Sequence, residues 1–264
     1  MRVVPIKLFD DNYSYAVYTP TSSYLVLVDP ADYASVKSAI AANPELASLE
    51  VTHVFSTHKH WDHSGNNEEI AKELPQVKIV GGSEDNIPAC NTPLTDGQQL
   101  ELENGLKVTA LHTPCHTRGH MLYYFEDSSG NDIDKAVFTG DTIFVGGCGK
   151  FFEGDAEQML AAMEKAKTLP PDTKLFCGHE YTEANFRWAT QVDSENIPMK
   201  QKYEKVVEMR QQGKPTVPSS VQEEMETNIF MRAPLLTGLL GVGNPVEAMH
   251  ALREMKNSGK TQVN

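Results

Sequence analysis

The sequence predicts an α+β protein in which a mixed region of strands and helices is followed by a smaller helical region. Short apolar runs rich in β-branched and aromatic residues indicate strands up to about residue 180. Segments with apolar residues at helical spacing lie between them. Beyond that point the strand pattern stops and only helical patterns follow. We therefore expect a layered sheet-and-helix domain over 1–179 and an α-helical domain over 180–264.

The strands of the first domain are expected where apolar runs end at Gly, Pro or polar turn residues. These runs cover 2–8, 13–18, 24–28, 51–57, 77–80, 106–112, 121–126, 135–139 and 174–178. Helices between them are predicted from apolar side chains that share one helical face, namely Val36, Ala39 and Ile40 in 32–42, Ile70, Ala71 and Leu74 in 66–74, and Met159, Leu160 and Met163 in 155–168.

The second domain contains helical patterns separated by turn residues. Asn196, with Pro198 just after it, is a typical helix start, and Gly213 is a typical stop. We expect helices over 182–191, 196–212 and 245–256, with a Pro- and Ser-rich connector over 214–220. The sequence shows no internal repeat.

Composition excludes several classes of protein. Charged residues make up 22% of the chain and hydrophobic ones 40%, which is typical of globular proteins. The formal net charge of −13 disfavours nucleic acid as a partner. No stretch is apolar and long enough to cross a membrane, and no signal peptide is evident at the N-terminus. The four cysteines form no C-x-x-C pair. We expect a cytoplasmic protein with reduced thiols, acting on a small molecule without an obligatory protein partner.

A dense group of metal-ligand residue types follows the predicted strand 51–57. His58, His60, Asp62 and His63 stand together in the run Thr57-His-Lys-His-Trp-Asp-His63. Imidazole and carboxylate groups suit zinc, iron or manganese. Extended spacing puts His58 and His60 on one side, and Asp62 and His63 follow where the chain turns toward a second metal. The alternative is a polar turn rich in histidine, which a chain with 9 histidines makes improbable.

Three further donors follow other predicted strands: His116, Asp141 and His179. Side chains at strand ends, on loops held by a rigid sheet, are where catalytic groups usually lie. Cys115 precedes His116, but a buried thiol is the better interpretation there than a nucleophile. Asp29 ends another strand, and two roles stay open for it: a hydrogen bond to a ligand histidine or a turn carboxylate before Pro30. His53, His112 and His120 are candidates for similar supporting contacts, and packing is their default role.

The motif His58-x-His60-x-Asp62-His63, with His116, Asp141 and His179, resembles the metallo-β-lactamase superfamily. Gly140-Asp-Thr-Ile-Phe-Val-Gly-Gly-Cys-Gly-Lys-Phe-Phe-Glu-Gly154, Cys177-Gly-His-Glu-Tyr181 and Ala251-Leu-Arg-Glu-Met-Lys256 are similar to the glyoxalase II, or hydroxyacylglutathione hydrolase, family. The resemblance implies an αββα sandwich with metals at one sheet edge. It also implies a first metal held by His58, His60 and His116, a second held by Asp62, His63 and His179, and Asp141 as the bridge.

The same resemblance implies the reaction. Such enzymes hydrolyse S-(2-hydroxyacyl)glutathione thioesters, and the expected case is S-D-lactoylglutathione to D-lactate and glutathione, the last step of methylglyoxal detoxification. Two divalent cations about 3.5–4 Å apart lower the pKa of a bridging water and yield hydroxide near neutral pH. Zinc is the expected metal, with iron or manganese as alternatives, and Asp62 would orient the hydroxide. A thiol with a pKa of about 8.5 leaves without a strong general acid.

Substrate contacts are also implied by the resemblance. The residues matched to glutathione binding are Lys150, Phe152, Tyr181, Arg253 and Lys256. Arg253 and Lys256 are three residues apart on one helix face, and a solvated basic face is the alternative interpretation. The family often has Tyr where this chain has Phe152, so any hydrogen bond from that hydroxyl is missing here.

Other functions remain as alternatives. A persulfide dioxygenase with one iron would not need Asp62, His63 and His179, which are all present. An RNA-processing nuclease would need a basic surface, and a secreted β-lactamase would need a signal peptide. A scaffold without catalysis is disfavoured because the ligand set is complete. Metal analysis with a thioester hydrolysis assay would separate these possibilities.

Overall fold

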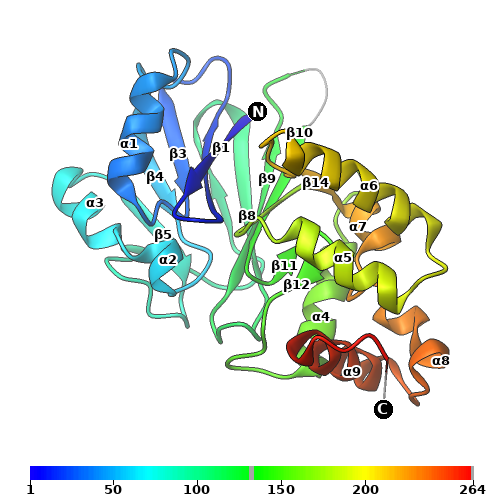
Figure 1. Ribbon diagram of the computed structural model, residues 1–264. Coiled ribbons are helices and arrows are strands. Elements are labelled where there is room, and N and C mark those ends of the chain that lie inside the picture. Colours follow the sequence, from blue (N-terminus) through cyan, green and yellow to red (C-terminus); the bar gives the residue numbers. More distant parts are fainter. Residues whose placement is uncertain (131–133, 263–264) are drawn as a thin grey trace.

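The computed structural model describes residues 1–130 and 134–262 and contains two packed six-stranded sheets (Figure 1). The first sheet begins with antiparallel strands and continues with parallel ones, whereas only β10 and β13 are parallel in the second. The first sheet has the order β1 (Arg2–Leu8), β2 (Asn12–Tyr18), β3 (Tyr24–Val28), β4 (Glu50–Phe55), β5 (Lys78–Gly82), β6 (Thr92–Leu94). The second has the order β14 (Ser219–Ser220), β13 (Lys174–Cys177), β10 (Asp134–Gly140), β9 (Met121–Asp127), β8 (Leu106–His112), β7 (Gln99–Glu101).

Helices cover the outer faces of both sheets (Figure 1). The first sheet carries α1 (Tyr33–Ala42), α2 (Trp61–Ser64) and α3 (Asn67–Glu73). On the side of the second sheet lie α4 (Ala156–Lys167), α5 (Thr182–Val192), α6 (Ile197–Gln211), α7 (Val221–Thr227), α8 (Thr237–Leu240) and α9 (Pro245–Ser258). A small hairpin of β11 (Ile143–Phe144) and β12 (Gly147–Cys148), and the 3-10 turns Glu103–Gly105 and Ala233–Leu235, complete the elements. The predicted αββα arrangement with a helical C-terminal part is therefore confirmed.

Two apolar cores explain why the strands are hydrophobic on both faces. Val26 and Val28 of β3 point into the core between the sheets, beside Phe55. Leu25 and Leu27 of the same strand point into the core beneath α1 and α3. This alternation follows from the two-residue period of a strand. Both faces of β3 are buried, so the strand appears in the sequence as a continuous apolar run.

The predicted helix limits agree with their capping groups. The Asp155 side chain accepts from the Gln158 N–H, and the Gln158 side chain contacts the Asp155 N–H in return, which starts α4. The Asn196 side chain accepts from the Met199 N–H at the start of α6. Gly213, with φ of 67°, follows the end of that helix. Gly adopts this left-handed conformation without the strain other residues meet there.

The region after residue 180 contains elements that the sequence did not predict, namely α7, α8, the 3-10 turn Ala233–Leu235 and one short strand. Ser219 and Ser220, expected in a connector, form β14 and pair antiparallel with β13 of the second sheet. Two residues carry no periodic signal, so the sequence could not indicate this strand. The helical part is also joined to the sheets through Glu180, which accepts from the Tyr13 hydroxyl and the Thr216 N–H. Within the described residues, the helices are all too short or too polar to span a lipid bilayer.

Candidate metal centre

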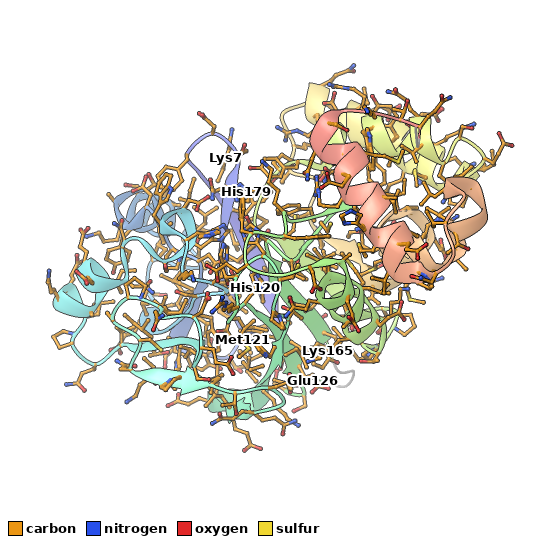
Figure 2. All side chains as sticks on the ribbon, turned by 90° about the horizontal axis from the view of Figure 1, so that it is seen from below. Lys7, His120, Met121, Glu126, Lys165 and His179 are labelled. Carbon is orange, nitrogen blue, oxygen red and sulfur yellow. The ribbon has the colours of Figure 1, made fainter. Side chains whose placement is uncertain are left out.

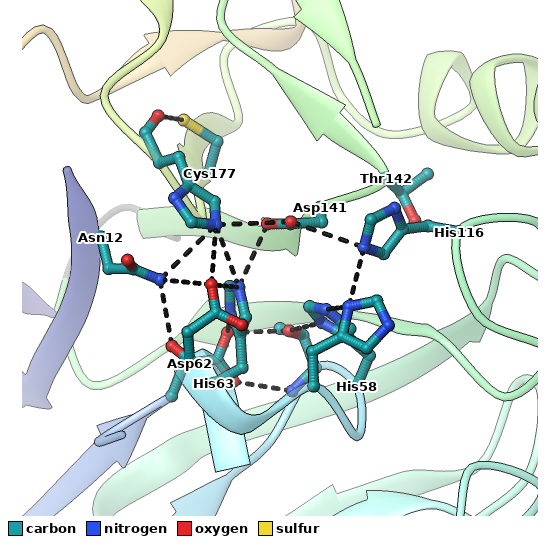
Figure 3. A network of polar contacts seen from close by, with 12 residues as sticks. Asn12, His58, Asp62, His63, His116, Asp141, Thr142 and Cys177 are labelled. Carbon is teal, nitrogen blue, oxygen red and sulfur yellow. Dashed lines mark hydrogen bonds and ion pairs between the residues drawn. The ribbon is translucent and has the colours of Figure 1, made fainter. Parts of the chain in front are cut away.

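The predicted ligands come together at one edge of the two sheets (Figure 3). His58 and His60 follow β4, and the chain then turns into α2, which carries Asp62 and His63. The remaining three come from the second sheet: His116 lies between β8 and β9, Asp141 follows β10, and His179 follows β13. All four loops leave the same edge, so residues more than a hundred positions apart in sequence become neighbours.

The first group of donors is made of three imidazole rings. His58 Nε2 lies 3.0 Å from His60 Nδ1, and His116 Nε2 lies 3.1 Å from the same atom. His58 and His116 are buried, and His60 is half-buried. Three ring nitrogens that point at a common position provide the ligand set that a borderline cation such as zinc requires.

The second group contains Asp62, His63 and His179. His63 Nε2 lies 3.3 Å from His179 Nε2, and the latter lies 3.5 Å from Asp62 Oδ2. The donor atoms of each group lie within 4.8 Å of one another. The seven predicted ligands thus lie together, and His58, His63 and Asp141 form a third set of donors within the same distance. Which donors would share one metal ion stays a prediction.

Asp141 lies between the two groups. Its Oδ1 is 3.3 Å from His63 Nε2, and its Oδ2 is 3.5 Å from His116 Nε2. The Oδ1 atom is buried and accepts no hydrogen bond from the residues that the structure describes. A buried carboxylate oxygen left without a donor is costly unless a cation binds it. The donor set thus fits divalent metal binding, and Asp141 lies within reach of both groups.

The backbone beside Asp141 leaves no space for side chains. A Cβ atom on Gly178 would lie 2.4 Å from Asp141 Oδ1, closer than atoms can approach. Gly140 has a φ of 47°, and a Cβ there would lie 2.4 Å from Thr57 Oγ1. Glycine is required at both positions for the strand ends to deliver Asp141 and His179 to the centre.

Hydrogen bonds to the outer ring nitrogens orient the histidines. His63 Nδ1 lies 2.8 Å from Asp29 Oδ2, and His179 Nδ1 lies 2.8 Å from Asp11 Oδ1. His116 Nδ1 donates to the Lys150 carbonyl at 3.0 Å. Such partners fix the tautomer, so that Nε2 of each ring is free for a cation. Asp29 therefore makes a hydrogen bond to His63, a predicted ligand, which was one of its two predicted roles.

Asp11 and Asn12 also contact predicted ligands, although no sequence pattern indicated them. Asp11 lies in the turn between β1 and β2 and Asn12 begins β2, where a polar Asp-Asn pair resembles any hairpin turn. Asn12 Nδ2 donates to Asp62 Oδ2 at 3.0 Å, which orients that carboxylate. The contact joins residues 50 positions apart, and nothing in local spacing could indicate it.

Of the three other histidines near the predicted ligands in sequence, His120 is the one for which the described residues show a hydrogen bond to a predicted ligand. It is fully buried, and its Nε2 accepts from the Asp141 N–H at 3.2 Å. His112 Nε2 instead contacts the Arg118 carbonyl, and His53 contacts Thr52. Figure 2 labels His120 and His179, which lie toward the centre of the view, between the cyan elements and the green strands.

Burial and charge set the protonation of the centre. Burial lowers the pKa of His58 well below its ordinary value, so its ring is neutral, as a metal ligand must be. Burial alone would raise the pKa of Asp141, but His63 and His179 hold it well below its usual range. Burial opposes charge on His63 too, yet the Asp141 and Asp29 carboxylates raise its pKa. The centre therefore contains the ionised carboxylate of Asp141, the neutral ring of His58 and the ring of His63, which is paired with carboxylates.

Two family models match nearly the whole chain. The metallo-beta-lactamase superfamily model matches residues 9–179, and the model of the hydroxyacylglutathione hydrolase C-terminus matches residues 180–259. A curated relative, the cytoplasmic hydroxyacylglutathione hydrolase of Arabidopsis thaliana, is 40% identical over 260 residues, which cover 97% of this chain and 98% of the relative. This chain belongs to the hydroxyacylglutathione hydrolase family.

Solved structures share the fold of this hydroxyacylglutathione hydrolase family member. ETHE1 from Myxococcus xanthus superposes with a TM-score of 0.66 at 24% identity, covering 96% of this chain and 90% of that one. TTHA1623, solved in a di-iron-bound form, gives a TM-score of 0.53 at 26% identity over 67% of this chain and 92% of that one. The first likeness concerns the fold alone.

Three of the predicted substrate residues lie beside the metal centre. The Phe152 ring is 61% exposed, with its centroid 5.1 Å from that of His116. The Tyr181 ring stacks on His179 at 4.7 Å with an interplanar angle of 5°. Lys150 is exposed, and its ammonium lies 5.9 Å from the Phe152 ring centroid. The Phe152 ring thus lies against the first donor group, and the Tyr181 ring lies against the second.

The predicted basic helix face is not a simple solvated surface. Arg253 on α9 is only 7% exposed, and its Nη1 donates to the Cys148 carbonyl at 3.1 Å. It therefore supports the segment that leads to Lys150. Lys256 is half-buried, and its Nζ donates to the Ala184 carbonyl and lies 4.9 Å from the Trp188 ring centroid. Burial, with help from the Arg253 charge, lowers the pKa of Lys256 to about 8.

Proposed function

We propose that this protein hydrolyses S-(2-hydroxyacyl)glutathione thioesters, with S-D-lactoylglutathione as substrate and D-lactate and glutathione as products. The observation that carries the proposal is the arrangement of six donors in two groups of three around Asp141, in a chain of the hydroxyacylglutathione hydrolase family. We place the protein in the cytoplasm, the compartment named for its relative from Arabidopsis thaliana. The domain limits 1–179 and 180–264 are part of the same proposal.

The metal assignment is that of the sequence analysis. His58, His60 and His116 would hold one divalent ion, Asp62, His63 and His179 would hold the other, and Asp141 would contact both. Zinc is the metal we propose, with iron or manganese as alternatives, because imidazole and carboxylate ligands accept all three. A pair of such ions supplies a Lewis acid for the thioester carbonyl and a water acidic enough to act as a nucleophile near neutral pH.

The chain's own residues prepare the reacting groups. Asn12 Nδ2 donates to Asp62 Oδ2 at 3.0 Å. The other carboxylate oxygen of Asp62 would then orient the attacking water. A carbon–oxygen bond forms at the thioester carbonyl, and the carbon–sulfur bond then breaks. The departing thiolate needs no strong acid, because thiols have a pKa of about 8.5. This explains why the site works with metal ligands and lacks a separate nucleophile such as Cys115, whose pKa is raised to about 12 by burial.

Glutathione carries two carboxylates, and cationic side chains would receive them. Lys150 is exposed beside Phe152, and Lys256 lies on α9 near the hairpin segment that Arg253 supports. Tyr181 and Phe152 provide ring faces for the part of the substrate between the thioester and the carboxylates. The overall charge of −13 makes these local cations the natural anchors for an anionic substrate.

Replacing Lys256 with alanine is expected to raise KM for the glutathione thioester roughly tenfold, since a charge-assisted hydrogen bond contributes about 1.5–3 kcal/mol, less where solvent screens it. The chemical step should change little because the metal ligands are untouched. KM and kcat should be measured near pH 7, where Lys256, with a pKa of about 8, is charged.

Lys260→Ala serves as the matched control, because Lys260 is an exposed lysine four residues farther along. A small thioester without glutathione's carboxylates should be hydrolysed equally by the wild type and by Lys256→Ala. An unchanged KM for the glutathione thioester would show that Lys256 does not receive a carboxylate.

The proposed function itself is tested by incubating the purified protein with S-D-lactoylglutathione and following the loss of thioester absorbance. We expect hydrolysis with release of free glutathione, and no comparable turnover of a β-lactam. Protein that carries its metal and leaves the thioester intact would contradict the proposal.

A further inference from the structure

Asp85 is a fully buried carboxylate with donors on both of its oxygens. It lies in the turn after β5, outside the donor groups. Its Oδ2 accepts from the Lys59 N–H at 2.7 Å and from the Thr117 hydroxyl at 3.0 Å. Its Oδ1 accepts from the Gly119 N–H at 3.1 Å. Burial raises the pKa of this carboxyl, while these donors counteract the shift. None of the three is a charged group, so the contact is not an ion pair.

The three donors belong to the two loops that carry the first donor group. Lys59 stands between His58 and His60 in the loop that leaves β4 of the first sheet. Thr117 and Gly119 follow His116 in the loop between β8 and β9 of the second sheet. The first donor group is therefore assembled across two sheets, and the Asp85 carboxylate hydrogen-bonds to both loops.

The backbones around Asp85 are already in contact. A Cβ atom on Gly119 would lie 2.3 Å from the Asp85 nitrogen, and one on Gly82 would lie 2.1 Å from the Gly119 carbonyl oxygen. Because the backbone has no space to relax, removing one partner of a hydrogen bond here leaves the other partner unsatisfied or forces a loop to move. Glu153 joins the same loops from outside, through Lys59 Nζ and the Arg118 N–H, but its side chain is 28% exposed.

We infer that Asp85 is a positioning residue, which holds the loop of His58 and His60 against the loop of His116 so that their ring nitrogens meet. The inference rests on the metal assignment proposed above. Partners that orient metal ligands typically change metal affinity by about 10–100-fold when they are removed. Asp85 acts one step farther out, through the backbone on either side of the ligands.

Asp85→Asn is the sharpest test, because asparagine keeps the size of the side chain. Its NH2 group must face either the Gly119 N–H or the Lys59 N–H, so at least one backbone hydrogen bond to a ligand loop is lost. Full-length protein is stripped of metal and titrated with Co²⁺ against a competing chelator. We expect wild type to bind two equivalents and Asp85→Asn to bind one of them about 10–100-fold more weakly. Thr117→Val, which removes a single donor at nearly constant volume, should show a smaller loss of the same kind.

Glu224→Gln is the matched control. Glu224 is also fully buried and accepts from Ser219, Gly146 and Asn228, but it contacts neither ligand loop. Its variant should lose stability on heating while keeping both Co²⁺ equivalents. Equal Co²⁺ affinity in the wild type, Asp85→Asn and Thr117→Val would overturn the inference and leave the metal assignment intact. A wild-type protein that binds no Co²⁺ would overturn both.

Discussion

Asp141→Ala is expected to lower thioester hydrolysis by roughly 10³-fold or more, because stabilisation by the metal pair is worth several kcal/mol and each 1.4 kcal/mol is a factor of ten in rate. Asp141 is the only donor in the described structure whose oxygens lie within 3.5 Å of both groups, 3.3 Å from His63 and 3.5 Å from His116. Its loss should reduce binding at both positions. Metal content per chain and the hydrolysis rate should be measured on the same preparation.

Asp193→Asn controls for the loss of a buried carboxylate. Asp193 is 7% exposed and pairs with Arg232 in the helical region, away from the donors. This variant should keep its metal and its rate. Asp141→Ala protein that retains full activity with a single ion per chain would contradict the two-ion assignment.

His179→Ala is expected to have the second-largest effect. His179 Nε2 lies 3.3 Å from His63 Nε2, and its Nδ1 is held by Asp11 at 2.8 Å, so the ring is fixed in the second group. Its removal should weaken the second metal position much more than the first, and slow hydrolysis by roughly 10²-fold or more. The first metal position should be retained, because its three imidazoles come from other loops. The fold should also be retained.

The comparison for this variant is His250→Ala, which removes an exposed histidine on α9. Metal content in that protein should equal that of the wild type. Should His179→Ala retain wild-type metal stoichiometry and wild-type rate together, His179 is not a ligand.

Sequence patterns predicted the parts of the site that depend on local order. His58, His60, Asp62 and His63 lie within six consecutive residues, and each remaining predicted ligand follows a strand that is apolar enough to recognise. The contacts of Asp11, Asn12 and Asp85 depend on which loops meet in space. A single sequence holds no periodic signal for such contacts, so these residues became visible only in the folded chain.

Element length decided which parts of the fold could be predicted. β3 is buried on both faces along its whole length and appears as a continuous apolar run, and β10 is buried from Ala136 onward, where its apolar residues stand together. β11, β12 and β14 have two residues each, and α2 has four, which is too short for a period of either kind. Arg253 shows a related limit: its place on a helix face was predictable, but its burial against the Cys148 carbonyl depends on packing between α9 and β12.

The most direct test of the account is hydrolysis of S-D-lactoylglutathione before and after metal removal. Protein treated with a strong chelator and passed through a desalting column should lose its activity while keeping its secondary structure. Addition of about two equivalents of Zn²⁺ per chain should restore the rate. Metal-free protein that hydrolyses the thioester at the full rate would contradict the assignment of the seven donors to a metal centre.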